Sequence, residues 1–160
     1  MDNERPKSTA FDYAALADFR YQIRRFLRFS EQASRQAGVE PQQHQLMLAL
    51  RASGKHGLRI ADLAERLQIQ HHSTVELVDR LEERSLILRG RGTDDRREVY
   101  VSLTARGEHI LRELTLHHRE ELRSAAPALI AALRRVTGRE RKSLPKRATK
   151  PTRAAAKEKA

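Results

Sequence analysis

Residues 61–103 read ADLAERLQIQHHSTVELVDRLEERSLILRGRGTDDRREVYVSL, and this stretch decides the fold. A short amphipathic helix over 61–67 is followed by a tight turn and a second helix over about 72–84, the outline of a helix-turn-helix. Two strand-like segments, 86–91 and 98–103, flank a polar tip rich in turn-forming residues. The stretch predicts a helix-turn-helix followed directly by a basic β-hairpin.

The second helix divides into two faces. Its apolar stripe at helical spacing consists of Thr74, Leu77, Val78 and Leu81. Val75 lies outside that stripe, and an outward β-branched side chain can contact a thymine methyl group in the major groove. We therefore predict that this outer face reads DNA through His72, Ser73, Val75, Glu76 and Arg80.

Glu76 leaves two interpretations open. Its carboxylate can accept a hydrogen bond from cytosine N4 in the major groove. It can equally pair with Arg80, which follows it by one helical turn.

The hairpin is predicted to contact the minor groove beside the recognition helix. A narrow minor groove over A·T steps has a negative potential that attracts arginine. The alternative is an ordinary solvated hairpin. The arginines that flank the tip are Arg89, Arg91, Arg96 and Arg97.

The net charge of the chain is a second, weaker indication that the protein binds nucleic acid. The formal net charge of the 160-residue chain is +11, which favours binding to a polyanion because neutralised phosphates release counterions. Residues 139–160 contain nine basic and two acidic residues, so most of this excess lies at the C-terminal end. Net charge therefore does not by itself predict a specific DNA-binding surface.

Composition excludes several classes of protein. The chain has no cysteine, which rules out disulfides and thiolate zinc sites. No apolar run approaches the roughly 20 residues that cross a bilayer, and the first residues lack a signal-peptide core. No phosphate-binding glycine loop or nucleophile elbow is present, so no catalytic residue is predicted. We expect a soluble, cytoplasmic protein that is not an enzyme and has no cofactor or membrane partner.

The seven histidines raise the question of a metal site. His117 has Glu113 and Glu121 one turn to either side, a set that zinc accepts. Without cysteine this pattern is weak, and structural or solvated histidines, His118 included, are the favoured interpretation. No metal site is predicted.

Several motifs together resemble the MarR family. Residues 95–107, DRREVYVSLTARG, are similar to that family's wing signature, an acidic-x-Arg tip and a strand ending in Leu-Thr-x-x-Gly. Residues 77–82 are similar to the end of its recognition helix, and residues 63–67 to its supporting helix. The resemblance covers about 11–136, and it departs from the family pattern at the positions of Val75 and Glu76.

The resemblance implies how the parts act. Arg97 is the arginine expected to enter the minor groove, and Asp95 is expected to hold the wing tip by pairing with an arginine such as Arg80. The family implies a homodimer on a pseudo-palindromic operator in double-stranded DNA, often released by a small molecule. A pocket for an aromatic or anionic effector would involve Tyr13, Phe19, Tyr21 and Arg24, although plain core packing of these residues is the alternative.

The expected fold is mainly α-helical, a winged helix-turn-helix with long N- and C-terminal dimerisation helices. Pro127 is expected to interrupt the last helical region, so that a final helix over 127–136 buries Leu129, Ile130 and Leu133. The expected divisions are a dimerisation helix (9–38), the winged helix-turn-helix (41–103), C-terminal dimerisation helices (104–137) and a basic disordered tail (138–160).

Two functions fit these features. The first is a sequence-specific transcriptional regulator, most simply a repressor. The alternative is an architectural, nucleoid-type DNA-binding protein that depends on its basic tail and raises affinity for any DNA by counterion release.

Overall fold

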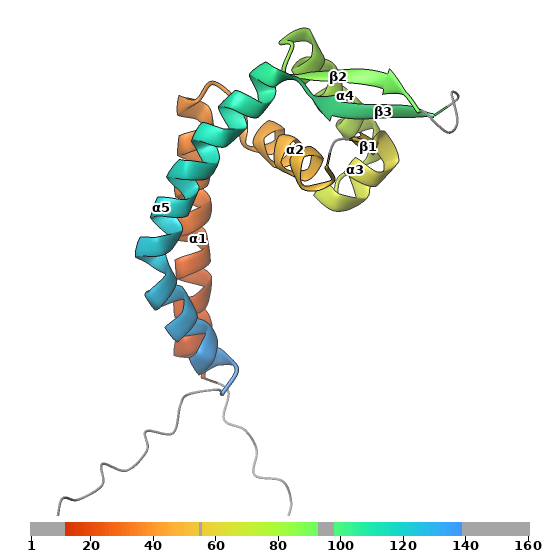
Figure 1. Cartoon of the computed structure of the whole chain (residues 1–160). Helices are drawn as coiled ribbons and strands as arrows, with labels where there is room; N and C mark the ends of the chain where they lie inside the picture. Colours follow the sequence, from red (N-terminus) through yellow and green to blue (C-terminus); the bar gives the residue numbers. More distant parts are fainter. Residues whose placement is uncertain (1–11, 55, 93–97, 139–160) are drawn as a thin grey trace, which may run out of the picture.

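A computed structural model of the chain describes residues 12–54, 56–92 and 98–138. Two long helices, α1 and α5, lie side by side as an arm, and the other elements form a lobe at one end of it (Figure 1). The elements in chain order are α1 (Tyr13–Gln36), α2 (Pro41–Ala52), β1 (Leu58–Arg59), α3 (Ile60–Leu67), α4 (His71–Glu83), β2 (Ile87–Arg91), β3 (Val99–Leu103) and α5 (Ala105–Val136).

The three strands form one antiparallel sheet with β3 in the centre. β1 and β2 pair with its two sides, so that Leu58 and Arg89 both lie opposite Val101. The predicted hairpin is confirmed in β2 and β3, while its tip over 93–97 lies outside the described residues. The sheet packs beside α4, which places the hairpin next to the helix-turn-helix (Figure 1).

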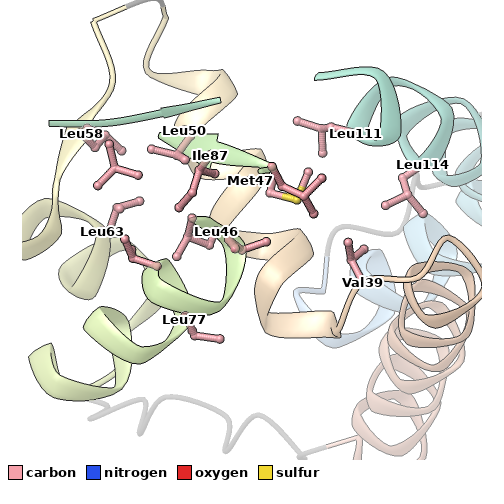
Figure 2. Close-up of a cluster of buried hydrophobic side chains, with 14 of the residues drawn as sticks. Val39, Leu46, Met47, Leu50, Leu58, Leu63, Leu77, Ile87, Leu111 and Leu114 are labelled. Atoms are coloured by element: carbon pink, nitrogen blue, oxygen red, sulfur yellow. The ribbon is translucent and has the colours of Figure 1, made fainter. Parts of the chain in front are cut away.

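One hydrophobic core joins the lobe to the arm. Leu46 and Met47 of α2 are fully buried and sit at its centre, between the helix-turn-helix and the start of α5. In Figure 2, Leu111 and Leu114 of α5 gather near Val39 and Met47. Because α5 contributes Leu111 and Leu114 to this core, the arm and the lobe share one packed interior.

The prediction that Pro127 separates two C-terminal helices is wrong, because α5 continues through it as a single 32-residue helix. A proline inside a helix costs about 3 kcal/mol. Packing against α1 on both sides of the proline offsets this cost. Beyond it, Ala132 is fully buried and Arg135 pairs with Asp18 of α1 at 3.0 Å.

The arm leaves an apolar surface uncovered. Ile130 and Leu133 were predicted to be buried, but in the single chain they are 46% and 44% exposed, and Leu129 is half-buried. Leu16 and Leu27 of α1 are each 46% exposed. Within the described part of the chain, no helix is both long and apolar enough to cross a membrane.

Two histidines meet where α1, α2 and α5 join. The rings of His44 and His118 lie 4.8 Å apart, and Phe26 and Phe29 of α1 approach His118 edge-on. His118 Nδ1 lies 2.6 Å from the Leu114 carbonyl, so it must carry the proton, and in the neutral ring Nε2 accepts from the Ser30 hydroxyl at 2.7 Å. The ring contact between His44 of α2 and His118 of α5 links the lobe to the arm.

Acid is expected to weaken the fold through His44. Burial, and secondarily the charge of His118, lowers the pKa of His44 to about 4, below its ordinary 6.5. Its contribution to stability is therefore complete above pH 6.5 and is lost progressively as the pH falls from 6.5 to about 4. Between pH 7.5 and 4.5 the free energy of unfolding should fall by about 2 kcal/mol from this group. Urea unfolding at both pH values measures the loss; if His44→Phe loses as much stability as the wild type, His44 is not its source.

Candidate nucleic-acid interface

The helix-turn-helix consists of α3, a three-residue turn and α4. Gln68 ends α3 in the left-handed conformation, with φ 53°, at the position where glycine is most common. The Ile69 amide donates to the Ala64 carbonyl at 3.1 Å, and its half-buried side chain packs on the core as predicted. The turn therefore holds α4 at a fixed angle to α3 without the usual glycine.

The two predicted faces of α4 are confirmed. The expected stripe is buried, with Thr74, Val78 and Leu81 at 0% exposure and Leu77 at 7%. On the opposite side His72, Glu76 and Arg80 are exposed, while Ser73 and Val75 are half-buried. Five side chains thus remain at the surface of a helix whose other face is fixed in the core.

Glu76 and Arg80 form an exposed ion pair, with 3.7 Å between the carboxylate and the guanidinium. Both side chains are 65% exposed, and pairs of this kind contribute little to stability. Glu76 therefore pairs with Arg80 in this structure, as one of its two interpretations predicted. Because the pair is exposed, either side chain can leave it for another partner.

The arginines of the wing fall into different environments. Arg91 is exposed at the end of β2. Arg96, Arg97 and the supporting Asp95 lie outside the described residues. Arg89, predicted as a DNA contact, instead has its guanidinium bound by two carboxylates of α4, those of Asp79 and Glu82.

The charge of Arg89 is stabilised by those partners. Partial burial opposes the charged form, but hydrogen bonds to Asp79 and Glu82 outweigh it and raise the pKa of Arg89 above its ordinary value. Its side chain is only 26% exposed. Arg89 is thus an internal contact between wing and helix in this structure.

A polar network at the base of the wing was not predicted from the sequence. Arg59, before α3, binds Asp62 at 2.9 Å and Glu98, next to β3, at 3.1 Å. The Tyr100 hydroxyl donates to Glu98 at 2.7 Å. The hydrogen bond from Arg59 lowers the pKa of Asp62, so the network stays charged at neutral pH. The i, i+3 spacing of Arg59 and Asp62 was a usable signal, whereas Glu98 lies too far along the chain to be paired from sequence.

The predicted effector residues are only partly brought together. Tyr21 and Arg24 line an open hollow of about 460 Å³ on α1, together with Arg25, Leu27, Arg28 and Glu31. Phe19 is half-buried on another face of the helix, and Tyr13, at its start, is 78% exposed; neither lines this hollow. Among the described residues, no three His, Asp or Glu side chains, including His117, Glu113 and Glu121, come together as a metal-binding group.

The arrangement defines the class of winged helix-turn-helix DNA-binding domains, with a recognition helix exposed on one face and a β-hairpin beside it. Residues 37–98 match the MarR family model. The HTH-type transcriptional repressor MdtR of Bacillus subtilis is 38% identical over 72 residues, which are 44% of this chain and 44% of MdtR. Over residues 37–98 this chain is therefore similar to the MarR family. The alignment spans less than half of the length of MdtR.

Solved structures share the fold over most of the chain. A Staphylococcus aureus MepR variant bound to an oligodeoxyribonucleotide has a TM-score of 0.62 at 23% identity, covering 80% of this chain and 97% of that one. NadR in complex with 4-hydroxyphenylacetate has a TM-score of 0.59 at 22% identity, covering 86% of this chain and 96% of that one. The likeness extends beyond the winged-helix segment to the helical arm.

Proposed function

We propose that this chain is a homodimeric, sequence-specific DNA-binding regulator of transcription and catalyses no reaction. One observation carries the proposal: α4 is anchored by a fully buried stripe while its opposite face remains at the surface. Because packing does not engage those outward residues, they are free to contact a ligand of matching shape. A major groove about 12 Å wide admits a helix of this kind.

In this proposal the outer face of α4 reads base edges. Val75 contacts a thymine methyl group, and Ser73 and His72 at the start of the helix reach a base edge or a phosphate. Arg80 binds a phosphate once DNA displaces it from Glu76, and the freed carboxylate accepts from a cytosine amino group. The exposure of the Glu76–Arg80 pair supports this exchange.

The wing supplies a second contact. Arg91 at the exposed end of β2 approaches the DNA backbone beside α4, and Arg96 and Arg97 at the hairpin tip enter the minor groove. Asp95 supports the tip. The position of β2 and β3 beside α4 supports this arrangement (Figure 1).

A second copy of the chain covers the apolar surface of the arm. Leu16 and Leu27 of α1 and Ile130 and Leu133 of α5 are the side chains whose exposure supports this partner. Two α4 helices held about 34 Å apart by such a dimer would match half-sites one turn of DNA apart. Repression is the simplest outcome of such binding, and MdtR is named as a repressor.

An anionic aromatic effector fits the hollow beside Tyr21 and Arg24. Three arginines and a tyrosine line it, which suits a carboxylate attached to a ring. NadR binds 4-hydroxyphenylacetate, a ligand of that class. The effector would release DNA only if it bound the two states of the dimer unequally.

Selection of bound fragments from random DNA tests the proposal. The full chain and a chain ending at Gly138 should both enrich one pseudo-palindrome, the shorter chain with weaker salt-sensitive affinity. If the full chain enriches no sequence and the shorter chain loses binding altogether, the architectural function replaces this one.

A further inference from the structure

Glu82 of α4 holds both the main chain and the side chain of Arg89. One carboxylate oxygen accepts from the Arg89 amide at 3.1 Å, and the other accepts from the Arg89 guanidinium. β2 is an edge strand of the sheet, so this amide has no strand partner on that side. Glu82 thus fixes the outer edge of the wing to α4.

Asp79 binds the other end of the same guanidinium. Asp79 and Glu82 are one turn apart on α4, at i and i+3, and are 49% and 38% exposed. Without Arg89, two carboxylates would face the DNA backbone beside the recognition helix and repel its phosphates. The single positive charge of Arg89 neutralises one of these two negative charges, and its guanidinium binds both carboxylates.

Arg91 lies two residues along the same strand and offers a contrast. It is exposed and has no ion pair with any described residue. The two arginines therefore differ in role although they have the same charge and lie on one strand. Arg91 is available to a phosphate, and Arg89 is not.

We propose that Arg89 is a positioning residue that sets the wing against the recognition helix and masks Asp79 and Glu82 from phosphate, without itself contacting DNA. This inference rests on the proposed DNA-binding function. It differs from the sequence-based expectation that all four wing arginines contact DNA directly. Its mechanism is geometric and electrostatic, so it predicts a salt dependence different from that of a phosphate contact.

The salt dependence of DNA binding separates the two roles. Each phosphate contact adds about 0.9 to the slope of log affinity against log salt concentration. Arg89→Ala should weaken binding about tenfold with its slope nearly unchanged, because no phosphate contact is lost. Arg91→Ala should lower the slope by about one. A slope that falls by about one in Arg89→Ala overturns the proposal.

A rescue variant tests the masking. In Arg89→Ala, the further change Asp79→Asn should recover about threefold of the lost affinity, because one exposed carboxylate near phosphate is removed. In the wild type Asp79→Asn should change affinity by less than about twofold. If Asp79→Asn raises affinity equally in both backgrounds, Arg89 does not mask Asp79.

Hydrogen exchange tests the contact without DNA. The Arg89 amide should exchange at least about tenfold more slowly than the Arg91 amide, and Glu82→Ala should abolish that difference. If the Arg89 and Arg91 amides of the wild type exchange at equal rates, the hydrogen bond from the Arg89 amide to Glu82 is absent in solution. A protein that keeps this protection but binds no DNA would disprove the proposed function and leave the coupling of wing and helix intact. Unchanged circular dichroism is required of every variant.

Discussion

Replacing Gly107 with alanine is expected to lower the free energy of unfolding by about 3 kcal/mol or more. A methyl group at this position would lie 2.1 Å from the Leu86 carbonyl oxygen and 3.2 Å from Leu103 Cδ2. Within a helix the same change normally stabilises by up to about 1 kcal/mol. The expected sign is therefore opposite to the one that helix propensity predicts.

The backbone around Gly107 cannot move aside cheaply. The Leu86 carbonyl accepts from the Thr104 amide at 3.1 Å, and the Thr104 hydroxyl accepts from the Gly107 amide at 3.0 Å. That hydroxyl also donates to the Ser85 carbonyl at 2.8 Å. A shift of α5 would break these bonds together and open the core at Leu86, which is fully buried.

Urea unfolding measures the effect, and Gly90→Ala is its matched control. Gly90 lies in β2, and a methyl group there would meet nothing within 4 Å. The control should stay within about 0.5 kcal/mol of the wild type. Equal stability of the two variants would contradict the close approach of α5 to Leu86.

Carboxylates at Ile130 and Leu133 are expected to separate the proposed dimer and lower its affinity for a two-half-site operator by at least about 100-fold. Both side chains are nearly half exposed in the single chain, so Ile130→Glu and Leu133→Glu together should leave the protomer folded. In the dimer they would bury two charges without partners. The loss in DNA binding follows because each half-site must then be bound independently.

Sedimentation equilibrium gives the mass of the variant, and DNA binding is measured on the same sample. Ser124→Glu is the control, because it adds a carboxylate at an exposed polar position of the same helix. It should remain dimeric and keep operator affinity. A dimeric double variant would show that the uncovered apolar surface on α5 is not the interface.

Local periodicity was sufficient to predict α4 and its two faces. The stripe of Thr74, Leu77, Val78 and Leu81 depends only on helical spacing, and all four residues are buried. The strand-like segment predicted at 98–103 was equally local, and β3 spans Val99–Leu103. These features needed no knowledge of which distant segments meet.

Contacts between distant segments were not predictable. Pro127 was interpreted from its own chemistry, but packing of α5 along α1 keeps the helix continuous. Arg89 was assigned to DNA by its place in a basic hairpin, although the choice of Asp79 and Glu82 as partners depends on the angle between β2 and α4. Gly107 was identified from the sequence only as the last residue of the wing motif. Its close approach to Leu86 explains why a glycine stands there.

The neighbours of the predicted effector residues were also not predictable, although these residues lie on one helix. Phe19 and Tyr21 are two positions apart, which places their side chains about 200° apart around α1. Only Tyr21 and Arg24 line the hollow. The four residues were grouped because they lie close together in the sequence, but helical geometry divides them among different neighbours.

The central claim is that the outward face of α4 reads DNA bases, and the sequences selected from random DNA by Val75→Ala test it most directly. Val136→Ala makes the same change at the far end of α5 and serves as the control. The claim predicts that Val75→Ala relaxes the preference at one base pair in each half-site, at symmetric positions and with an unchanged salt slope. Identical selected sequences from both variants and the wild type would contradict it.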